Sequence, residues 1–556
     1  MQSLYQWQDK FLNEFTKTIQ TKDIFSLMAC PGSGKTVASI KAAKWLMEHG
    51  IVQRLVVCAH NDEICKQWRR TGTRLDLDLY CGWRTDHGDQ TDYKGFIVTY
   101  QSLATNVEGH RERCARHRTL LIVDEAHHIG EELPWNDHVN RAFEQVKKIL
   151  VVSGTPFRHD GRLPAFIDHT RDPETGELMR NVDFKYSYRQ AVEDGVCREV
   201  YFPHFDGKAE WRSRFGDEKE ALISDNVPRH LESERNRAAL DAHGDWIATV
   251  FTEANAKLTE CREAGHAQAG GLILAYNIAE ARKFAETLKR MTGEQATVVV
   301  SEERGADEKI ERFRRSSDRW VIAVKMINEG VDISRLRVLV YATICQTELH
   351  FLQAMGRIAR AGDDPEDDKY LAYAFLPHRK EFLAFADRMR KERDDAVDEI
   401  IRRNHERKLP SNDDASSDDN DSLFMPLGSS AISMGVFGPQ GNSTPDELAY
   451  AREYKTQHGL KYSPEIIAEI LRPTRGTPAA TATATEAPPK KQTDRQDEAK
   501  RLRAEIKEIV GRLVKGRLDG PSYEWYHIEW QKMGGSKQAI AGLEELRRKR
   551  AWLLTL

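Results

Sequence analysis

The sequence contains little that would suit a secreted or membrane-embedded protein. It has 556 residues and eight cysteines, and no two cysteines form a Cys-x-x-Cys pair. This spacing argues against a zinc ribbon and against a disulfide framework. No apolar run approaches the ~18 residues that a membrane-spanning helix needs. The N-terminal residues MQSLYQWQDKF lack the pattern of a secretory signal, so a cytoplasmic chain with no membrane partner is expected.

A strong charge bias is also missing. The 83 Lys and Arg residues and 87 Asp and Glu residues give a formal net charge of −4. This balance excludes a histone-like protein that binds nucleic acid through bulk positive charge, so any such contact must be local. Hydrophobic residues make up 40% of the chain. Most of it should therefore fold, and the length allows roughly three or four domains.

Short runs rich in Ile, Leu and Val alternate with helical stretches in two parts of the chain. This rhythm predicts mostly parallel sheets that are covered by helices on both faces. The expected fold class is therefore α/β, with two similar lobes. The runs lie at 25–29, 54–58, 96–99, 120–123 and 149–152 in the first lobe, and at 271–275, 296–300, 320–324, 338–342 and 370–375 in the second.

Shifts in composition divide the rest of the chain. Residues 411–422 hold five aspartates among Ser and Asn, which predicts a disordered acidic linker. Thr444-Pro445-Asp446-Glu447 has a capping-box pattern with Pro at the first helical position, so a helix should begin there. The expected divisions are a first lobe at 1–158, an irregular and then helical connection at 159–265, a second lobe at 266–380, a charged helix at 381–408, an acidic flexible linker at 409–443, a short helical segment at 444–471, a Pro/Ala/Thr-rich linker at 472–492 and a small basic helical C-terminal module at 493–556.

A phosphate-binding motif lies early in the first lobe. The residues Ala29-Cys30-Pro31-Gly32-Ser33-Gly34-Lys35-Thr36 follow an apolar run and precede a helix, which is the context that a P-loop requires. Its glycines let backbone N–H groups turn inward around phosphates, and the helix adds its positive N-terminal end. We expect Lys35 to reach the β and γ phosphates and Thr36 to ligate Mg²⁺. The alternative, a Gly-Ser turn beside a chance lysine, does not account for the flanking pattern.

Two carboxylates follow a buried strand further along the same lobe. In Leu120-Leu121-Ile122-Val123-Asp124-Glu125-Ala126-His127, both acids emerge at the carboxyl edge of the strand, where ligands bind in open α/β sheets. Asp124 would hold Mg²⁺ through water, and Glu125 would polarise the attacking water as general base. Two acids at a strand end can instead cap the next helix, but their place downstream of a P-loop lysine favours catalysis.

The spread of these motifs resembles superfamily 2 helicases and translocases, above all the DEAH-containing group related to restriction-enzyme Res subunits and XPB-like DNA helicases. The resemblance covers roughly residues 1–158 and 268–376 and implies two tandem RecA-like lobes. Trp7-Gln8 is similar to the end of the adenine-reading Q motif, with Gln8 as the base contact. Residues 55–68 resemble motif Ia, 98–103 resemble a later strand-contacting motif, and 153–156 resemble motif III. The implied coupling residues are His127, Ser153, Thr155 and Gln353.

Two motifs of the second lobe complete the resemblance. Residues 324–332 resemble motif V, in which Gly330 would allow close backbone approach and Asp332 would face the nucleotide. Residues 353–360 resemble motif VI. Arg357 and Arg360 are three apart, so we expect them to share one helix face and to reach the γ phosphate held by the first lobe. A solvated helix face is the alternative for two such arginines.

The same resemblance implies that one nucleic-acid strand is gripped by its phosphates, which carries no sequence preference. Each candidate contact could equally be a structural strand-end residue. DNA is favoured over RNA because SGTP replaces the SAT of DEAD-box RNA helicases, an argument by analogy. The candidates are His60, Thr99, Gln101, Tyr276 and Lys325.

The function that these motifs predict is an ATP-driven, DNA-stimulated helicase or translocase that uses Mg²⁺. Replication, recombination or repair, in a phage or mobile element among other settings, would suit it. The alternatives are the motor subunit of a restriction or defence complex and a nucleotide-gated remodeller that does not separate strands. The C-terminal module, with Trp525 and Trp530 among Lys and Arg, is expected to bind a partner protein or DNA. A zinc site is not expected.

Overall fold

The computed structural model describes residues 4–81, 92–126, 134–154, 168–171, 178–213, 216–300, 303, 305–324, 333–361, 371–391, 424–460 and 462–472, with the single residues 506 and 549. The chain forms two units, Met1–Thr474 and Arg475–Leu556. The expected C-terminal module lies almost wholly outside the described residues. None of the helices in the described ranges has both the length and the apolarity that crossing a bilayer demands.

The first lobe is built on a seven-stranded sheet in which every paired strand is parallel. The sheet order is β3 (Leu79–Cys81), β4 (Gly95–Thr99), β2 (Arg54–Ala59), β5 (Thr119–Asp124), β6 (Lys148–Ser153), β1 (Ile24–Ala29) and β9 (Phe184–Tyr186). The helices are α1 (Gln6–Thr18), α2 (Lys35–Glu48), α3 (Asp62–Arg74), α4 (Tyr100–Ala104), α5 (Val107–Arg116), α6 (Pro134–Ala142) and α7 (Tyr188–Glu193).

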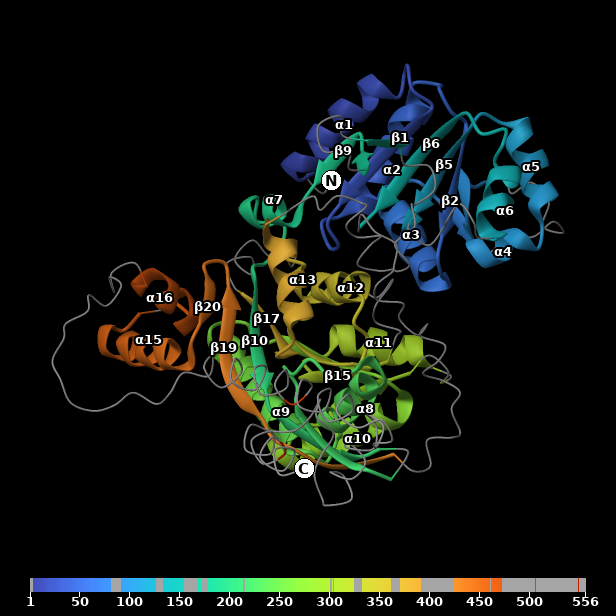
Figure 1. The fold of residues 1–556 in the computed structure, drawn as a ribbon. Helices are drawn as coiled ribbons and strands as arrows, with labels where there is room; N and C mark the ends of the chain where they lie inside the picture. The colour runs from blue at the N-terminus through green and yellow to red at the C-terminus, as the bar shows by residue number, and fades with distance from the viewer. Residues whose placement is uncertain are drawn as a thin grey trace. The chain divides into compact units, whose positions relative to one another are not determined.

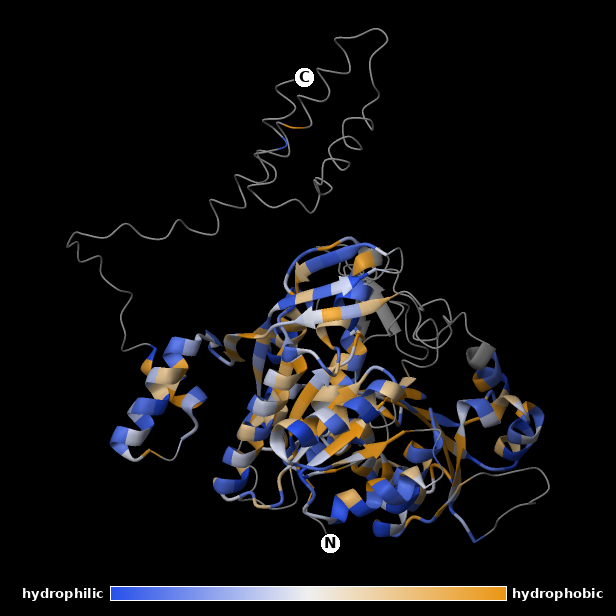
Figure 2. Ribbon diagram, turned by 90° about the horizontal axis from the view of Figure 1, so that it is seen from below, coloured by the Kyte–Doolittle hydropathy of each residue, from blue (hydrophilic) through white to orange (hydrophobic). Residues whose placement is uncertain are grey.

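Both faces of this sheet are buried, as an all-parallel sheet requires. Ile122 of β5 packs into a core that also contains residues of α1, α2 and α3. Its neighbours Leu121 and Val123 point to the opposite face and pack with Leu103 of α4 and Val139 of α6. Across the described chain, Figure 2 shows apolar residues concentrated on strands and polar residues on the outward-facing sides of helices. The central strands are therefore continuous hydrophobic runs rather than alternating ones.

The second lobe has an eight-stranded sheet assembled from three separate stretches of chain. Its order is β14 (Ala296–Val299), β15 (Trp320–Ala323), β13 (Gly270–Ala275), β16 (Leu336–Ala342), β17 (Ala372–Pro377), β10 (Val200–Asp206), β19 (Ile432–Gly438) and β20 (Gly441–Ser443). Figure 1 shows β10 between β17 and the orange β19. The strands from β14 to β10 pair in parallel, and β10, β19 and β20 pair antiparallel.

Helices cover this second sheet as well. They are α8 (Arg229–Ala239), α9 (Asp245–Glu263), α10 (Ile278–Thr292), α11 (Ala306–Arg315), α12 (Glu348–Ala359), α13 (Lys380–Lys391), α15 (Pro445–His458) and α16 (Pro464–Leu471). A smaller antiparallel sheet is formed by β12 (Glu218–Leu222), β11 (Lys208–Arg212) and β18 (Met425–Ser429), and β7 (Asp168–Arg171) pairs with β8 (Leu178–Asn181). The predicted α/β fold of two tandem RecA-like lobes is confirmed.

Two expectations about the connecting segments are wrong. The stretch 159–265, expected to be irregular and then helical, contains six strands in its described residues, with α7 between β9 and β10 and with α8 and α9 after β12. Strand β10 lies inside the second sheet. The stretch 409–443, expected to be a flexible linker, forms β18, β19 and β20 from residue 425 onward. The physical reason is burial, because β19 covers the open edge of β10, and Val436 and Phe437 pack into the two cores.

One local prediction is confirmed in detail. Helix α15 begins at Pro445, and Thr444 is its N-cap. The Thr444 hydroxyl accepts a hydrogen bond from the Glu447 backbone N–H at 3.3 Å, and the Glu447 carboxylate accepts one from the Thr444 backbone N–H at 2.8 Å. This reciprocal pair satisfies two N–H groups that the helix itself leaves without partners. The predicted charged helix at 381–408 is described only as α13, and residues 392–408 lie outside the described ranges.

Candidate active site

The P-loop connects β1 to α2 at the carboxyl edge of the first sheet. Gly32 and Gly34 have φ angles of 87° and 91°, a left-handed backbone that favours glycine. The Ser33 hydroxyl, which is fully buried, donates to the Cys30 carbonyl at 2.7 Å and closes the loop from inside. Lys35 is the first residue of α2, so it stands at the positive end of the helix dipole. The loop therefore has the form of an anion cradle.

Lys35 and Glu125 are joined across the site by an ion pair. The Lys35 Nζ lies 3.0 Å from Glu125 Oε1, and Glu125 Oε2 accepts a hydrogen bond from the Gly154 backbone N–H at 3.0 Å. A Cβ at Gly154 would lie 2.3 Å from the Lys35 Nζ, so a larger residue there would displace the end of the lysine side chain. Glu125 has a φ of 49°, which is uncommon outside glycine. Motif III-like Gly154 thus contacts both the acid and the lysine.

Asp124 ends β5 beside Glu125 and is buried. Its carboxylate Oδ2 accepts a hydrogen bond from the Trp68 indole N–H at 2.6 Å, and its backbone carbonyl accepts one from the Tyr100 hydroxyl at 2.6 Å. Burial raises the pKa of Asp124 well above its usual value, and the Glu125 carboxylate raises it further, whereas Lys35 and the Trp68 N–H lower it. A second cation beside these two acids would relieve their repulsion, which fits a divalent metal.

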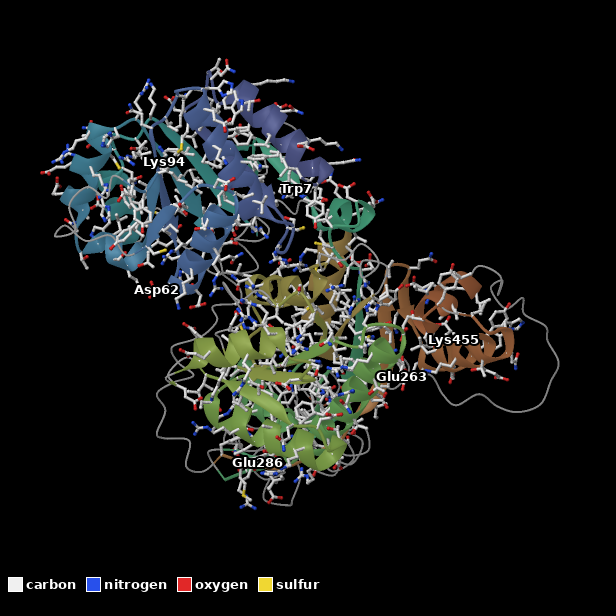
Figure 3. The ribbon with its side chains drawn as sticks, turned by 180° about the vertical axis from the view of Figure 1, so that it is seen from behind. Trp7, Asp62, Lys94, Glu263, Glu286 and Lys455 are labelled. Carbon is white, nitrogen blue, oxygen red and sulfur yellow. The ribbon has the colours of Figure 1, made fainter. Side chains whose placement is uncertain are left out.

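Gln8 lies on α1 with both ends of its side-chain amide engaged by the protein. The amide NH₂ donates to the Gly34 carbonyl of the P-loop at 3.1 Å, and the amide oxygen accepts from the Tyr5 backbone N–H at 3.1 Å. The side chain is 2% exposed. Trp7, labelled in Figure 3, stacks on Tyr186 with ring centroids 4.6 Å apart. In this structure Gln8 therefore links α1 to the P-loop, and a contact of its amide with adenine stays a prediction.

The motif VI-like segment packs directly on the P-loop. A Cβ at Gly356 would lie 2.4 Å from Pro31 Cβ, and one at Gly32 would lie 3.3 Å from both the Gly356 carbonyl oxygen and Arg360 Cβ. Glycine at these two positions is what permits so close an approach between the lobes. The first side-chain atom of Arg360 therefore lies next to Gly32 of the P-loop.

The expectation that Arg357 and Arg360 share a helix face is wrong. Helix α12 ends at Ala359, and Arg360 is extended, with φ −63° and ψ 124°. Buried Arg198 causes this ending. Its backbone N–H donates to the Ala359 carbonyl at 2.6 Å, and its guanidinium donates to the carbonyls of Ile358, Arg360 and Leu336. A charged donor at a helix C-terminus satisfies carbonyls that the helix leaves open.

Cys197, next to Arg198, contacts the P-loop from the same side. Its sulfur lies 4.0 Å from the Cys30 sulfur, and Cys197 forms an isolated antiparallel bridge with Arg360. The contact with Cys30 and burial together hold the pKa of the Cys197 thiol well above its usual value. The segment 196–198 therefore joins Cys30 of motif I to the end of motif VI.

The remaining predicted residues lie at several places. His60 follows β2, Thr99 is the N-cap of α4 with its hydroxyl accepting from the Ser102 N–H at 3.1 Å, and Gln101 is exposed on α4. Tyr276 is half-buried after β13, and Ser153 is buried at the end of β6. Thr36 and Gln353 lie on α2 and α12. The predicted residues outside the described ranges are His127, Thr155, Lys325, Gly330 and Asp332.

Four contributors to the site were not singled out from sequence: Trp68, Tyr100, Arg198 and Cys197. Trp68 and Tyr100 occur inside segments that resemble family motifs, so a search for buried donors near Asp124 could have found them. Arg198 offers no local signal, because its partners at 336–360 are more than 130 residues away.

Comparison with known proteins matches segments of both lobes to described families. The family model described as type III restriction enzyme, res subunit, matches residues 2–158, and the helicase conserved C-terminal domain matches residues 257–362. An uncharacterized protein of Mycobacterium leprae is 32% identical over 431 residues, which cover 76% of this chain and 71% of the relative. The chain belongs to the superfamily 2 helicases.

Two further relatives match smaller shares of this chain. An uncharacterized protein of Mycobacterium tuberculosis is 34% identical over 388 residues, covering 70% of this helicase, which itself spans only 63% of that protein's length. The DNA 3′-5′ translocase XPB2 of Sulfurisphaera tokodaii is 24% identical over 355 residues, covering 60% of this helicase and 74% of the relative. Membership of the family implies an ATP-binding motor.

Proposed function

We propose that this helicase couples Mg-ATP hydrolysis to movement along DNA or to its unwinding. One observation carries the proposal: the segment with Arg357 and Arg360 packs on Pro31 and Gly32 of the P-loop. The guanidinium groups of the second lobe would then donate hydrogen bonds to phosphates held by the P-loop of the first lobe. Hydrolysis would therefore depend on how closely the two lobes approach each other. Opening and closing of the lobes is then the step that moves the nucleic acid.

The residues present fit a magnesium-bound triphosphate. Gly32, Gly34 and the N-terminus of α2 would hold the phosphates, and Lys35 would exchange its bond with Glu125 for a phosphate oxygen. Asp124 and Thr36 would hold the metal, which supplies charge neutralisation on the phosphates. Glu125, released from Lys35, would orient the attacking water and accept its proton. Arg360 would stabilise the charge that develops on the transferred phosphate.

DNA is the proposed substrate because a relative, XPB2, is named a DNA 3′-5′ translocase. His60, Thr99 and Gln101 stand at the carboxyl ends of β2 and β4, which the register aligns as Ala59 beside Thr99. With Tyr276 and Lys325 they are the proposed phosphate contacts. A role in replication, recombination or repair follows from that substrate, and Gly330, Asp332 and the coupling residues His127, Ser153, Thr155 and Gln353 keep their proposed roles.

A second candidate is the motor subunit of a restriction or defence complex. The family model that matches the first lobe describes the res subunit of type III restriction enzymes. In that case the chemistry of the site is unchanged and the difference is a partner chain that carries the nuclease. The residues beyond 472 are the proposed place for such a partner to bind. Co-purification of a nuclease subunit with the full chain would favour this candidate.

The test is ATP hydrolysis by the full chain without nucleic acid and with single-stranded DNA, duplex DNA, forked DNA or RNA. Lys35→Ala and Glu125→Gln should abolish DNA-stimulated turnover, because one removes the phosphate contact and the other the base. Lys10→Ala and Glu14→Gln, at exposed positions of α1, are the matched controls. Unchanged turnover in either site variant would refute the proposal. Strand displacement compared with triplex displacement then separates unwinding from translocation.

A further inference from the structure

Asp124 is held at two points by buried aromatic residues. The Trp68 indole N–H reaches its carboxylate Oδ2 at 2.6 Å, and the Tyr100 hydroxyl reaches its backbone carbonyl at 2.6 Å. Trp68 and Tyr100 are 0% and 4% exposed, so neither bond competes with water. A hydrogen bond to an ionised acceptor in such surroundings is among the stronger ones in proteins. The two bonds therefore fix both the side chain and the peptide of Asp124.

Both aromatic residues belong to helices that begin at proposed nucleic-acid contacts. Helix α3 starts at Asp62, labelled in Figure 3, directly after His60 and its N-cap Asn61. Trp68 lies about two turns further along, roughly 10 Å from that cap. Tyr100 is the first residue of α4, whose N-cap is Thr99. A displacement of either helix start therefore moves a group that is bonded to Asp124.

The orientation of Asp124 matters because the next residue is Glu125, the proposed general base. Glu125 follows it with a φ of 49°, and its carboxylate is shared between Lys35 and Gly154. A backbone held in a sparsely populated conformation persists only when its surroundings enforce it. The Tyr100 hydroxyl bonds the carbonyl of the peptide that leads into Glu125. The described contacts thus run from α3 to the proposed metal-holding carboxylate, and from α4 to the proposed general base.

We propose that Trp68 and Tyr100 are positioning residues that transmit nucleic-acid contact at α3 and α4 to Asp124 and Glu125. The inference rests on the proposed function and adds a route by which DNA stimulates hydrolysis. Trp68 sets the direction of the Asp124 carboxylate toward the metal. Tyr100 sets the peptide that aims Glu125. Each acts through Asp124, Trp68 by its bond to the carboxylate and Tyr100 by its bond to the backbone carbonyl.

The first experiment removes the indole N–H of Trp68 in the full chain. Replacement of Trp68 by β-(3-benzothienyl)alanine substitutes sulfur for N–H at nearly the same volume, and Trp68→Phe is the genetic variant. The measured quantity is the binding of a fluorescent ATP analogue at increasing Mg²⁺ concentrations and in EDTA. We expect half-saturating Mg²⁺ to rise about tenfold, the effect of losing one charge-assisted bond, while affinity in EDTA stays the same.

The control is Trp246→Phe in the second lobe. Trp246 is also 0% exposed, and its indole N–H makes only a 3.4 Å bond to the Phe205 carbonyl. It reproduces the packing loss without touching Asp124. If the Mg²⁺ dependence of both Trp68 variants matches that of Trp246→Phe, the positioning role of Trp68 is overturned. The benzothienyl variant decides the question if Trp68→Phe does not fold.

The second experiment removes one oxygen atom, in Tyr100→Phe. We expect the ratio of DNA-stimulated to DNA-free turnover to fall about fivefold, since losing a neutral hydrogen bond of this kind corresponds to roughly that factor. Tyr201→Phe is the control, because Tyr201 is similarly buried and its hydroxyl bonds Glu469 in the second lobe. A ratio equal to the wild-type ratio would overturn the role of Tyr100.

The outcomes also separate this inference from the proposed function. If the wild-type chain hydrolyses no ATP with any nucleic acid, the proposed function fails. If the wild type is stimulated by DNA and the Trp68 and Tyr100 variants behave as their controls do, only the transmission route fails.

Discussion

The two lobes differ in how they are assembled. The first lobe takes six of its seven strands from residues 24–153 and closes with β9, and all its sheet pairs are parallel. The second takes strands from 200–206, 270–377 and 432–443 and ends in an antiparallel pair. The first lobe holds the cradle, the acids and their supporting donors, whereas the second supplies Arg360. The proposed catalytic residues are therefore concentrated in the lobe with the more local strand order, whereas the proposed arginine contact comes from the lobe assembled from three stretches of chain.

This comparison predicts that removing Arg360 impairs turnover but not nucleotide binding. Arg360→Ala should lower DNA-stimulated hydrolysis by about 10³-fold, the scale on which arginine fingers act, because the first lobe still holds the phosphates. ATP affinity and turnover are measured in parallel. Arg315→Ala on α11, where the side chain is 78% exposed, is the control. A proportionate loss of ATP affinity would mean that the second lobe binds the nucleotide and does not only complete the site.

The non-local assembly of the second lobe predicts a stability effect confined to it. Lys257 of α9 and Glu465 of α16 form a buried ion pair at 2.9 Å. Glu465→Leu should destabilise the second lobe by about 3 kcal/mol, since it removes the buried carboxylate and leaves the ammonium with only Glu260, which is half-exposed. Hydrogen exchange followed by mass spectrometry reports on each lobe separately. The double variant Lys257→Met/Glu465→Leu should recover most of the loss, and increased exchange in the first lobe would contradict the comparison.

Acid should weaken each lobe through one buried histidine. Burial lowers the pKa of His204 to about 4, with a smaller contribution from His378 in the same direction and opposing ones from Asn442 and Asp206. Burial and Arg113 lower that of His110 to about 4. In the unfolded chain each histidine binds a proton near pH 6.5, whereas in the folded lobe it stays neutral until about pH 4. The free energy of unfolding therefore falls as pH drops from 6.5 towards 4, by about 2 kcal/mol per histidine. Urea unfolding at both pH values measures it.

Variants at the two histidines assign the effect. His204→Gln should flatten the pH dependence of the second lobe alone, and His110→Gln that of the first lobe alone. An unaltered slope in both variants would show that other groups titrate.

The smallest expected effect comes from two helix caps of the same design. Thr444→Ala should cost about 1 kcal/mol in the second lobe, and Thr99→Ala a similar amount in the first. Only Thr99→Ala should also weaken DNA binding, since Thr99 is a proposed phosphate contact. Thermal unfolding and DNA titration of both variants measure this difference. Equal DNA affinity in the two variants would remove Thr99 from the proposed contacts.

The same contrast explains how much could be predicted from sequence. The P-loop, the two acids and the cap at Thr444 each depend on residues within a few positions of one another, and their local patterns were informative. Strand β10 was missed because Pro203 interrupts its apolar run, which argues against a central strand. The structure accommodates Pro203 at an irregularity in the pairing of β10 with β19.

The residue at which α12 ends could also not be predicted from the sequence. A three-residue spacing of arginines favours a shared helix face, and the helix-ending signals Gly362 and Pro365 lie beyond Arg360 in the sequence. The break comes from Arg198 and Cys197, which lie about 160 residues earlier and take up the last carbonyls. Partners so distant in the chain leave no periodic trace. The local patterns therefore predicted the motif residues around the P-loop, but neither their buried partners Trp68 and Arg198 nor the extended conformation of Arg360.

The three-part second sheet has a consequence for synthesis of the chain. Strand β10 leaves the ribosome well before β17, its parallel neighbour, and β19 follows later still. At about 5–20 residues per second, β10 waits roughly 10–50 s before residue 443 has been translated. During that interval its unpaired backbone groups are a template for intermolecular pairing. A recombinant fragment that ends before residue 424 would make that vulnerable edge permanent, and one that begins at residue 257 would lack β10 and leave the edge of β17 open instead.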